Sequence, residues 1–293
     1  MTPRRSLSGW LRTAPAPLLV VCSVSITQIG SALAKTLFAT LGTRGAVLVR
    51  VAFAALMLLA MHRPSLRKTP RRALGLAVLF GLVLGAMNWT FYGALSRVPL
   101  GVAVTVEFVG PLGVALLQSR RPRDLLWVAL AAGGIALLAP VGIGGPDPLG
   151  VGLALLAGVC WALYIVLGAR VGQAFTGGSG LSLAMVVAAI ILVPGGAVAA
   201  APIVTAPVLL LTGVAVAAFS SALPYTLEME ALRRMPQRVF GVLMSLEPAV
   251  AAIAGFLILG EHLGLRALAA MLLISVASAG VTAEGINEHL ESP

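Results

Sequence analysis

Long apolar runs alternate with short polar segments along the whole chain. We count about ten runs of roughly 17 to 25 residues, the length that a helix needs to cross the hydrocarbon core of a bilayer. No polar segment between them exceeds about a dozen residues, so the pattern leaves no room for a soluble domain. The runs lack the alternation of outer-membrane strands, which predicts an all-helical membrane protein. They lie at 17–38, 45–61, 74–95, 101–119, 125–141, 150–169, 181–200, 207–229, 239–259 and 264–283.

Composition and charge refine this picture. With 59% apolar residues, 10% charged residues and a mean hydropathy of +1.02, the chain is typical of integral membrane proteins. If the N-terminus is cytoplasmic, fifteen of the 20 Lys and Arg lie on that side, and only Arg44, Arg97 and Arg266 lie on the other. Positive charge concentrates on the cytoplasmic side, so both termini are predicted to be cytoplasmic. The net charge of +10 then reflects topology, and no nucleic-acid partner is expected.

The first run permits two interpretations. Basic residues, an apolar stretch and then Ala32-Leu33-Ala34 resemble a cleavable secretory signal, but the apolar run continues beyond them. Gln28, Ser31 and Lys35 share one helical face, as expected of a helix that lines a pore. The alternative is that these polar groups bind a neighbouring helix.

The two halves of the chain resemble each other at an offset of 137 residues. This offset aligns Ala94–Pro99 with Ala231–Pro236, and Pro111 with Pro248. Because each copy contains an odd number of spans, the second copy is predicted to be inverted. We therefore expect two five-helix repeats, 1–145 and 146–293, with a site near the membrane midplane where they meet.

Carboxylates and prolines interrupt the apolar runs. An ionisable side chain at the bilayer centre costs on the order of 2.5 to 3.5 kcal/mol, so it is a candidate functional group. Glu107 precedes Pro111, and Glu247 immediately precedes Pro248. Proline cannot donate a backbone hydrogen bond, so Pro111 is predicted to free the carbonyl of Glu107. Helix breaks are expected at both prolines.

A third break is expected in the eighth run, where Pro224 is predicted to free the carbonyl of Ser220. Glu228 lies one turn further on, at the inner end of that run, where it is either functional or solvated. Glu247 lies near mid-membrane. Arg50 and Glu107 fall in the outer half.

The intramembrane charges also have structural interpretations. Arg50 and Glu107 could simply pair, whereas Lys35 and Glu230 could extend to the nearest interface. Four polar or aromatic residues within the runs are candidates for lining a pocket, although such residues more often serve packing. They are Asn88, Tyr92, Trp161 and Tyr164.

Several classes are excluded by what the sequence lacks. It has no phosphate-binding loop for direct use of ATP, and its three histidines and both aspartates lie outside the apolar runs. No catalytic residues, metal site or cofactor are therefore expected, and the chain is predicted not to be an enzyme. An ion gradient remains as the source of energy.

Four motifs together resemble the drug/metabolite transporter superfamily, in particular the threonine/homoserine exporter branch of the EamA-type carriers. The motifs are Val106-Glu107-Phe108-x-Gly110-Pro111-Leu112, Ser119-Arg120-Arg121-Pro122, Ala222-Leu223-Pro224-Tyr225-x-Leu227-Glu228-Met229 and Met244-Ser245-x-Glu247-Pro248-Ala249. The resemblance implies an inner-membrane carrier that exports homoserine, threonine and related amino acids, in exchange for protons.

The resemblance extends to charged positions of the family. Arg50, Glu107, Glu228 and Glu247 match them, Lys35 stands where the family has an arginine, and Glu230 departs from the pattern.

Roles for these residues follow as hypotheses. Arg50 and Glu107 would hold the carboxylate and ammonium groups of a zwitterionic substrate. Glu247 would carry the coupling proton, with Glu228 as its cytoplasmic port. Expected partners are the substrate, protons and the bilayer, with a homodimer as a further option. The alternatives are a membrane protein without transport and a carrier of the same fold for another small metabolite.

Overall fold

The computed structural model describes residues 14–64, 69–118, 124–138, 147–175, 178–232, 234–235 and 243–291. The basic N-terminal residues and the motif Ser119–Pro122 lie outside them. The described secondary structure is helical and contains no strand. Its elements are α2 (Ala16–Thr36), α3 (Phe38–His62), α4 (Arg71–Leu95), α5 (Leu100–Glu107), α6 (Val109–Gln118), α7 (Asp124–Leu138), α8 (Pro148–Ala174), α9 (Ser179–Ala200), η2 (Ala201–Val204), α10 (Pro207–Ala217), η3 (Ala218–Ala222), α11 (Leu223–Leu232), α13 (Glu247–Leu259) and α14 (Leu265–Glu291).

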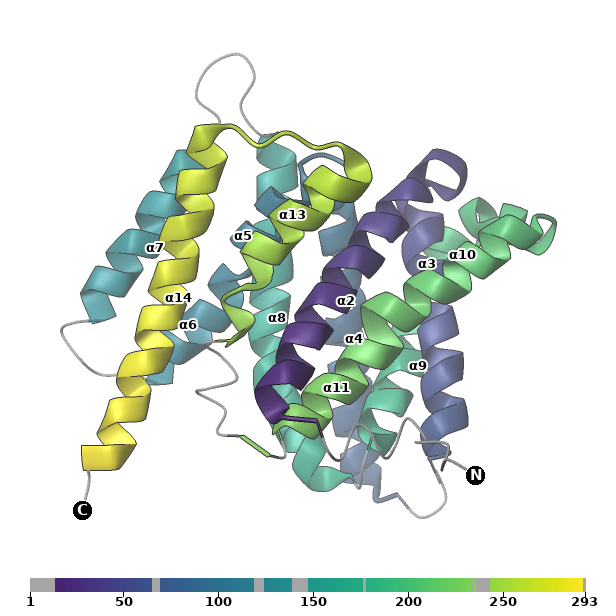
Figure 1. The fold of residues 1–293 in the computed structure, drawn as a ribbon. Helices are drawn as coiled ribbons and strands as arrows, with labels where there is room; N and C mark the ends of the chain where they lie inside the picture. The colour runs from purple at the N-terminus through teal and green to yellow at the C-terminus, as the bar shows by residue number, and fades with distance from the viewer. Residues whose placement is uncertain are drawn as a thin grey trace, which may run out of the picture.

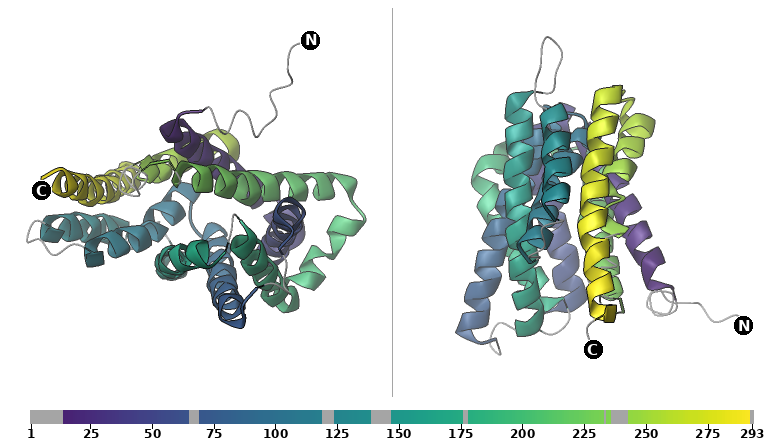
Figure 2. Two further views of the ribbon diagram at one scale, coloured as in Figure 1. Left: turned by 90° about the horizontal axis from the view of Figure 1, so that it is seen from below. Right: turned by 90° about the vertical axis from the view of Figure 1, so that its left-hand side faces the viewer.

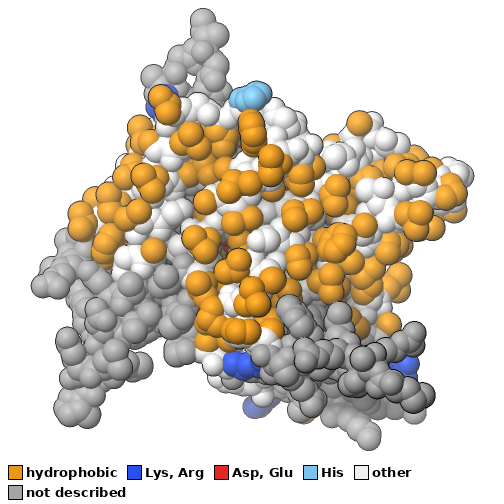
Figure 3. Space-filling view, in the orientation of Figure 1, with side chains coloured by type: hydrophobic (Ala, Val, Ile, Leu, Met, Phe, Trp, Pro, Cys, Tyr) orange, Lys and Arg blue, Asp and Glu red, His pale blue; other side chains and the backbone are white. Residues whose placement is uncertain are grey.

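The prediction of an all-helical membrane protein is confirmed. Within the described residues, six helical segments are long and apolar enough to span a bilayer. These segments are α2, α3, α4, α8, α9 with η2, and α10 with η3 and most of α11. Shorter apolar helical segments lie at Leu100–Val114, Glu247–Leu259 and Leu265–Ala277. Apolar side chains cover the face in Figure 3, where Lys and Arg lie towards the ends, as expected of a surface that contacts lipid.

The helices form one bundle of roughly parallel and antiparallel rods (Figures 1 and 2). α3 packs against α9, α4 packs against α8 and α9, and α7 packs against α14. α2 lies across α11 and α13, and α13 also contacts α5. The start of α2 and the end of α14 lie at the same end of the bundle (Figure 1).

Helix boundaries differ from the predicted apolar runs near a glycine in α3 and near two prolines. α3 begins at Phe38, ahead of its predicted start, and bends at Gly42, whose φ of 59° lies in the region that favours glycine. The run 101–119 is split at Phe108 into α5 and α6, and α13 begins only at Glu247. Both of these breaks lie within a few residues of a proline, Pro111 or Pro248.

Asp147 is the N-cap of α8, at the end of the bundle opposite the start of α2 and the end of α14 (Figure 1). The Asp147 side chain accepts hydrogen bonds from the backbone N–H of Leu149 (2.9 Å) and from Arg97 (2.8 Å). The guanidinium of Arg97 holds the pKa of Asp147 below its ordinary value. This pair connects the turn between α4 and α5 to the start of α8.

Candidate functional site

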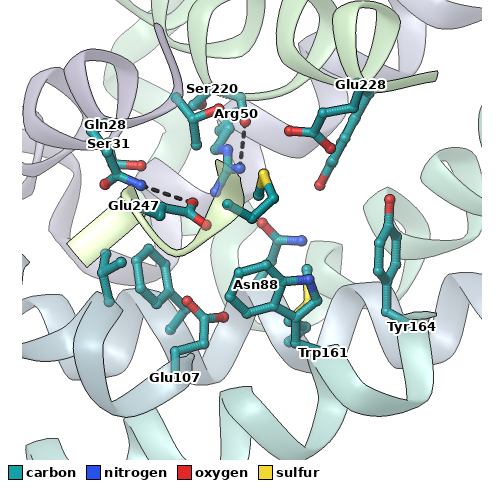
Figure 4. A pocket seen from close by; sticks show the side chains of 16 residues that line it. Gln28, Ser31, Arg50, Asn88, Glu107, Trp161, Tyr164, Ser220, Glu228 and Glu247 are labelled. Carbon is teal, nitrogen blue, oxygen red and sulfur yellow. Dashed lines mark hydrogen bonds between the residues drawn. The ribbon is translucent and has the colours of Figure 1, made fainter. Parts of the chain in front are cut away.

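A cavity of about 90 Å3 lies inside the bundle, where α2, α3, α4, α5, α8, η3, α11 and α13 converge (Figure 4). It is lined by seven residues that the sequence singled out for binding or coupling: Arg50, Asn88, Glu107, Trp161, Tyr164, Glu228 and Glu247. Residues of the polar face of α2, Gln28 and Ser31, join them. Six further lining residues were not singled out as site candidates: Thr27, Met87, Phe91, Val104, Tyr225 and Met244. Ser220, whose carbonyl Pro224 was predicted to free, also lines the cavity.

Arg50 is held by the broken helix that contains Pro224. The π-helical turn η3 precedes this proline, and Nη2 of Arg50 donates to the carbonyl of Ser220 (2.7 Å). Nε of Arg50 donates to Oγ of Ser221 (3.1 Å). The carbonyl that Pro224 was predicted to free is thus bound by a buried cation. Two of the five guanidinium N–H groups are used, which leaves others for a ligand.

Tyr92 has a different place from the one expected. Its ring is fully buried, and Cζ of Arg50 lies 5.4 Å from the ring centroid. Tyr92 is absent from the cavity lining and supports the guanidinium by a cation–π contact. The aromatic walls are instead Trp161 and Tyr164 of α8, and Tyr164 lies near Tyr225 with their ring centroids 6.3 Å apart.

Glu107 faces the same cavity as Arg50 without pairing with it. Among the described residues, the structure has no ion pair between them within 4.0 Å. The backbone carbonyl of Glu107, which Pro111 was predicted to free, lies against α8. A Cβ built on Gly158 of α8 would lie 2.6 Å from the Glu107 carbonyl oxygen, so that oxygen abuts α8. Only glycine permits this approach.

Glu247 stands at the first position of α13, held by a residue of α2. Nε2 of Gln28 donates to Oε1 of Glu247 (2.9 Å), and both side chains are buried. Glu228 accepts a hydrogen bond from Oγ of Ser23 (2.7 Å). The sequence placed Glu228 at the inner end of its span, yet its carboxylate lines the same cavity as Glu247 (Figure 4). The sequence estimated the depth of Glu228 from its position along its own helix. That estimate could not show that Glu228 and Glu247 share a cavity, because their helices, α11 and α13, both pack against α2.

Lys35 and Glu230 form ion pairs, which corrects the expectation that they simply reach towards the interface. Nζ of Lys35 lies 2.5 Å from Oε1 of Glu261 and donates to the carbonyl of Val98 (3.2 Å). The other carboxylate oxygen of Glu261 accepts from the backbone N–H of Leu100 (2.8 Å). Lys35 therefore belongs to a separate cluster that joins α2, α5 and the segment before α14. Glu230 pairs with Arg234 one turn away.

A helical bundle with a buried, charged cavity and a lipid-facing apolar surface defines a multi-pass membrane carrier. Comparison with known proteins agrees. Residues 148–283 match the EamA-like transporter family. The threonine/homoserine exporters RhtA of Salmonella typhimurium (strain LT2) and Escherichia coli (strain K12) are 45% and 44% identical over 282 and 281 residues, or 95% of this chain and 93% of theirs. One solved crystal structure shares the fold, with 20% identity, a TM-score of 0.53 and coverage of 92% of this chain and 99% of the other.

The chain therefore belongs to the EamA-like transporter family, close to its RhtA branch. It is a membrane transporter and not an enzyme.

Proposed function

We propose that this transporter exports threonine, homoserine and related small amino acids across the bacterial inner membrane. The observation that supports the proposal best is the cavity, which contains one buried cation and three carboxylates. Its volume of about 90 Å3 is well below the roughly 300 to 1,000 Å3 of pockets for larger ligands. A small zwitterion suits both its size and its charges. The names of the similar Salmonella and Escherichia proteins indicate the same substrates.

Arg50 and Glu107 are proposed to bind the two ends of the substrate. Arg50 is fixed by Ser220 and Ser221, and it retains N–H groups that can donate to a carboxylate. Glu107 can accept hydrogen bonds from the substrate ammonium. Asn88, Trp161 and Tyr164 would line the remainder of the site.

Export is proposed to be driven by proton antiport through Glu247. A proton and the positively charged end of the substrate can each balance the charge of the Glu247 carboxylate, so one can replace the other. Glu228 shares the cavity and can relay the proton towards the cytoplasm.

The transporter is proposed to contain ten spans arranged as two inverted five-helix repeats. Helix packing supports this arrangement. Three pairs of corresponding helices pack against each other: α3 with α9, α5 with α13, and α7 with α14. The remaining contacts are also repeated, because α4 packs against α8, and their counterparts, α10 with α11 and α2, pack against each other as well. The turn at Phe108 and the turn at Ser245 are also 137 residues apart. Both termini are proposed to be cytoplasmic.

Proteoliposomes test the transport and the coupling separately. Wild-type protein should exchange labelled homoserine for unlabelled homoserine without a gradient, and accumulate it when a pH gradient is imposed. Glu247→Gln, which mimics the protonated acid, should still exchange at saturating substrate but lose accumulation. Accumulation by the variant would exclude Glu247 as the coupling residue, whereas no exchange by the wild type would favour a role without transport. Exchange of another metabolite alone would favour a different substrate.

A further inference from the structure

Three buried polar atoms of cavity-lining residues have no hydrogen-bond partner among the described residues: Oγ1 of Thr27, Oε1 of Gln28 and Oε2 of Glu247. Two of them, Oε1 of Gln28 and Oε2 of Glu247, belong to side chains that contact each other. The side chains are 1% and 7% exposed and already share one hydrogen bond, from Nε2 of Gln28 to Oε1 of Glu247. Leaving a buried acceptor unpaired costs free energy. These two atoms therefore suit a ligand that donates hydrogen bonds.

The amide of Gln28 can present either of two faces to such a ligand. Its oxygen and nitrogen exchange places by a half-turn about the last side-chain bond, and the hydrogen-bond network decides which arrangement is stable. When Glu247 is ionised, it accepts from the amide nitrogen, and the amide oxygen remains free as an acceptor. When Glu247 is protonated, its O–H can donate to the amide oxygen, which turns the amide N–H groups towards the ligand.

We propose that Gln28 is a specificity and coupling residue that transmits the protonation state of Glu247 to the substrate. With Glu247 ionised, the amide oxygen of Gln28 and Oε2 of Glu247 accept hydrogen bonds from the ammonium group of the substrate, which has donors only. With Glu247 protonated, Gln28 offers a donor to that group and the substrate dissociates. No bond other than the O–H bond of Glu247 is formed or broken. The inference rests on the proposed proton antiport.

This arrangement makes the proton and the substrate weaken each other's binding, as antiport requires. By thermodynamic reciprocity, a proton that weakens substrate binding by some factor is itself bound more weakly, by the same factor, when substrate is present. Gln28 and Glu247 come from different helices, α2 and α13, so the switch also links two helices that are distant in the sequence.

Other charged and titratable groups around the cavity also respond to pH. They are Arg50 of α3, Glu107 of α5, Tyr164 of α8, and Tyr225 and Glu228 of α11. A test must therefore isolate the part of the pH dependence that passes through Gln28. A mutant cycle does so, because two residues that act as a unit give non-additive effects.

The experiment measures homoserine affinity of purified full-length protein across pH, for wild type, Gln28→Met, Glu247→Gln and the double variant. Wild-type affinity should fall as the pH is lowered. Gln28→Met, similar in size but without the amide, should weaken binding at high pH by about tenfold or more, as for loss of a hydrogen bond to a charged group. It should also flatten the pH profile to the extent that Glu247→Gln does, and the double variant should flatten it no further.

Ser25→Ala is the matched control on α2, because the Ser25 hydroxyl bonds only to Val21 of its own helix among the described residues. It should keep the wild-type profile. If Gln28→Met shifts the affinity but keeps the full pH dependence, Gln28 is a contact residue and the switch is overturned. An unchanged affinity and profile would also overturn it.

Infrared difference spectra between high and low pH give a second readout. The carbonyl band of protonated Glu247, identified by its loss in Glu247→Gln, should move to higher frequency in Gln28→Met, because the acid no longer donates to an amide. An unmoved band would contradict the switch. Absence of homoserine binding by the wild type is a different result, and it would count against the proposed function itself.

Discussion

Replacing Arg50, which is held by a broken helix, should change both the substrate affinity and the stability of the fold, and the two effects can be measured separately. Arg50→Gln removes the guanidinium that donates to the Ser220 carbonyl (2.7 Å) and to the Ser221 hydroxyl (3.1 Å). It also removes the only Arg or Lys among the residues that line the described cavity. A substrate carboxylate would lose its charged partner, and a buried carbonyl would lose its donor.

The magnitudes follow from the contacts. Hydrogen bonds to charged groups contribute roughly 1.5 to 3 kcal/mol, so the substrate affinity should fall by about tenfold to 150-fold. An unsatisfied buried carbonyl costs roughly 1 to 3 kcal/mol of stability. Arg50→Lys keeps the charge but loses the forked geometry, so it should lie between wild type and Arg50→Gln in affinity. Ser221→Ala removes only the bond to Nε and should weaken binding least.

Binding of labelled homoserine to purified protein measures the first effect, and thermal unfolding in the same detergent measures the second. Glu107→Gln belongs in the same series, since the ammonium end should depend on it as the carboxylate end depends on Arg50. The reasoning is refuted if Arg50→Gln and Glu107→Gln both retain wild-type affinity. A loss of stability without a loss of affinity would leave Arg50 as a structural residue that holds η3.

Three further predictions concern other parts of the bundle. In a background without native cysteines, Thr205→Cys should react with an impermeant thiol reagent in intact cells, and Gln173→Cys only after permeabilisation; the reverse pattern would contradict the proposed orientation. Lys35→Met should lower thermal stability, because it leaves Glu261 partly buried without its cation. The double variant Lys35→Met with Glu261→Gln should recover part of the loss. Equal stability of all forms would show that the ion pair contributes nothing. Gly158→Ala should reduce transport and stability, since its Cβ would lie 2.6 Å from the backbone of α5, and normal transport would contradict so close an approach.

The amino-acid sequence by itself determined the class of protein and most of the groups at its site. Apolar length and composition required membrane helices, because a bilayer admits few other solutions for the backbone. Charges and prolines inside those runs are costly, so each one indicated a special position. Arg50, Glu107, Glu228 and Glu247 were found in this way, and all line the cavity. The reasoning needed only local energetics.

The tertiary structure decided which of these groups act together. Hydropathy cannot reveal that Glu261 lies beside Lys35, because the two are 226 residues apart and Glu261 occupies a polar segment between helices. It could not show that Tyr92 lies behind Arg50, since a buried tyrosine has the same sequence signal whether it packs or binds. The role of Gly158 became visible only in the structure, where Glu107 of α5 packs directly against it.

The partnership of Gln28 with Glu247 is the clearest case. The sequence placed Gln28 on a polar face of its helix, which is equally typical of a pore and of contact between helices. Only the crossing of α2 over α13 brings its amide within 2.9 Å of the carboxylate. Periodicity along one helix fixes which direction a side chain points, but what it meets there depends on how separate helices pack, because contacts between distant segments leave no local pattern in the chain.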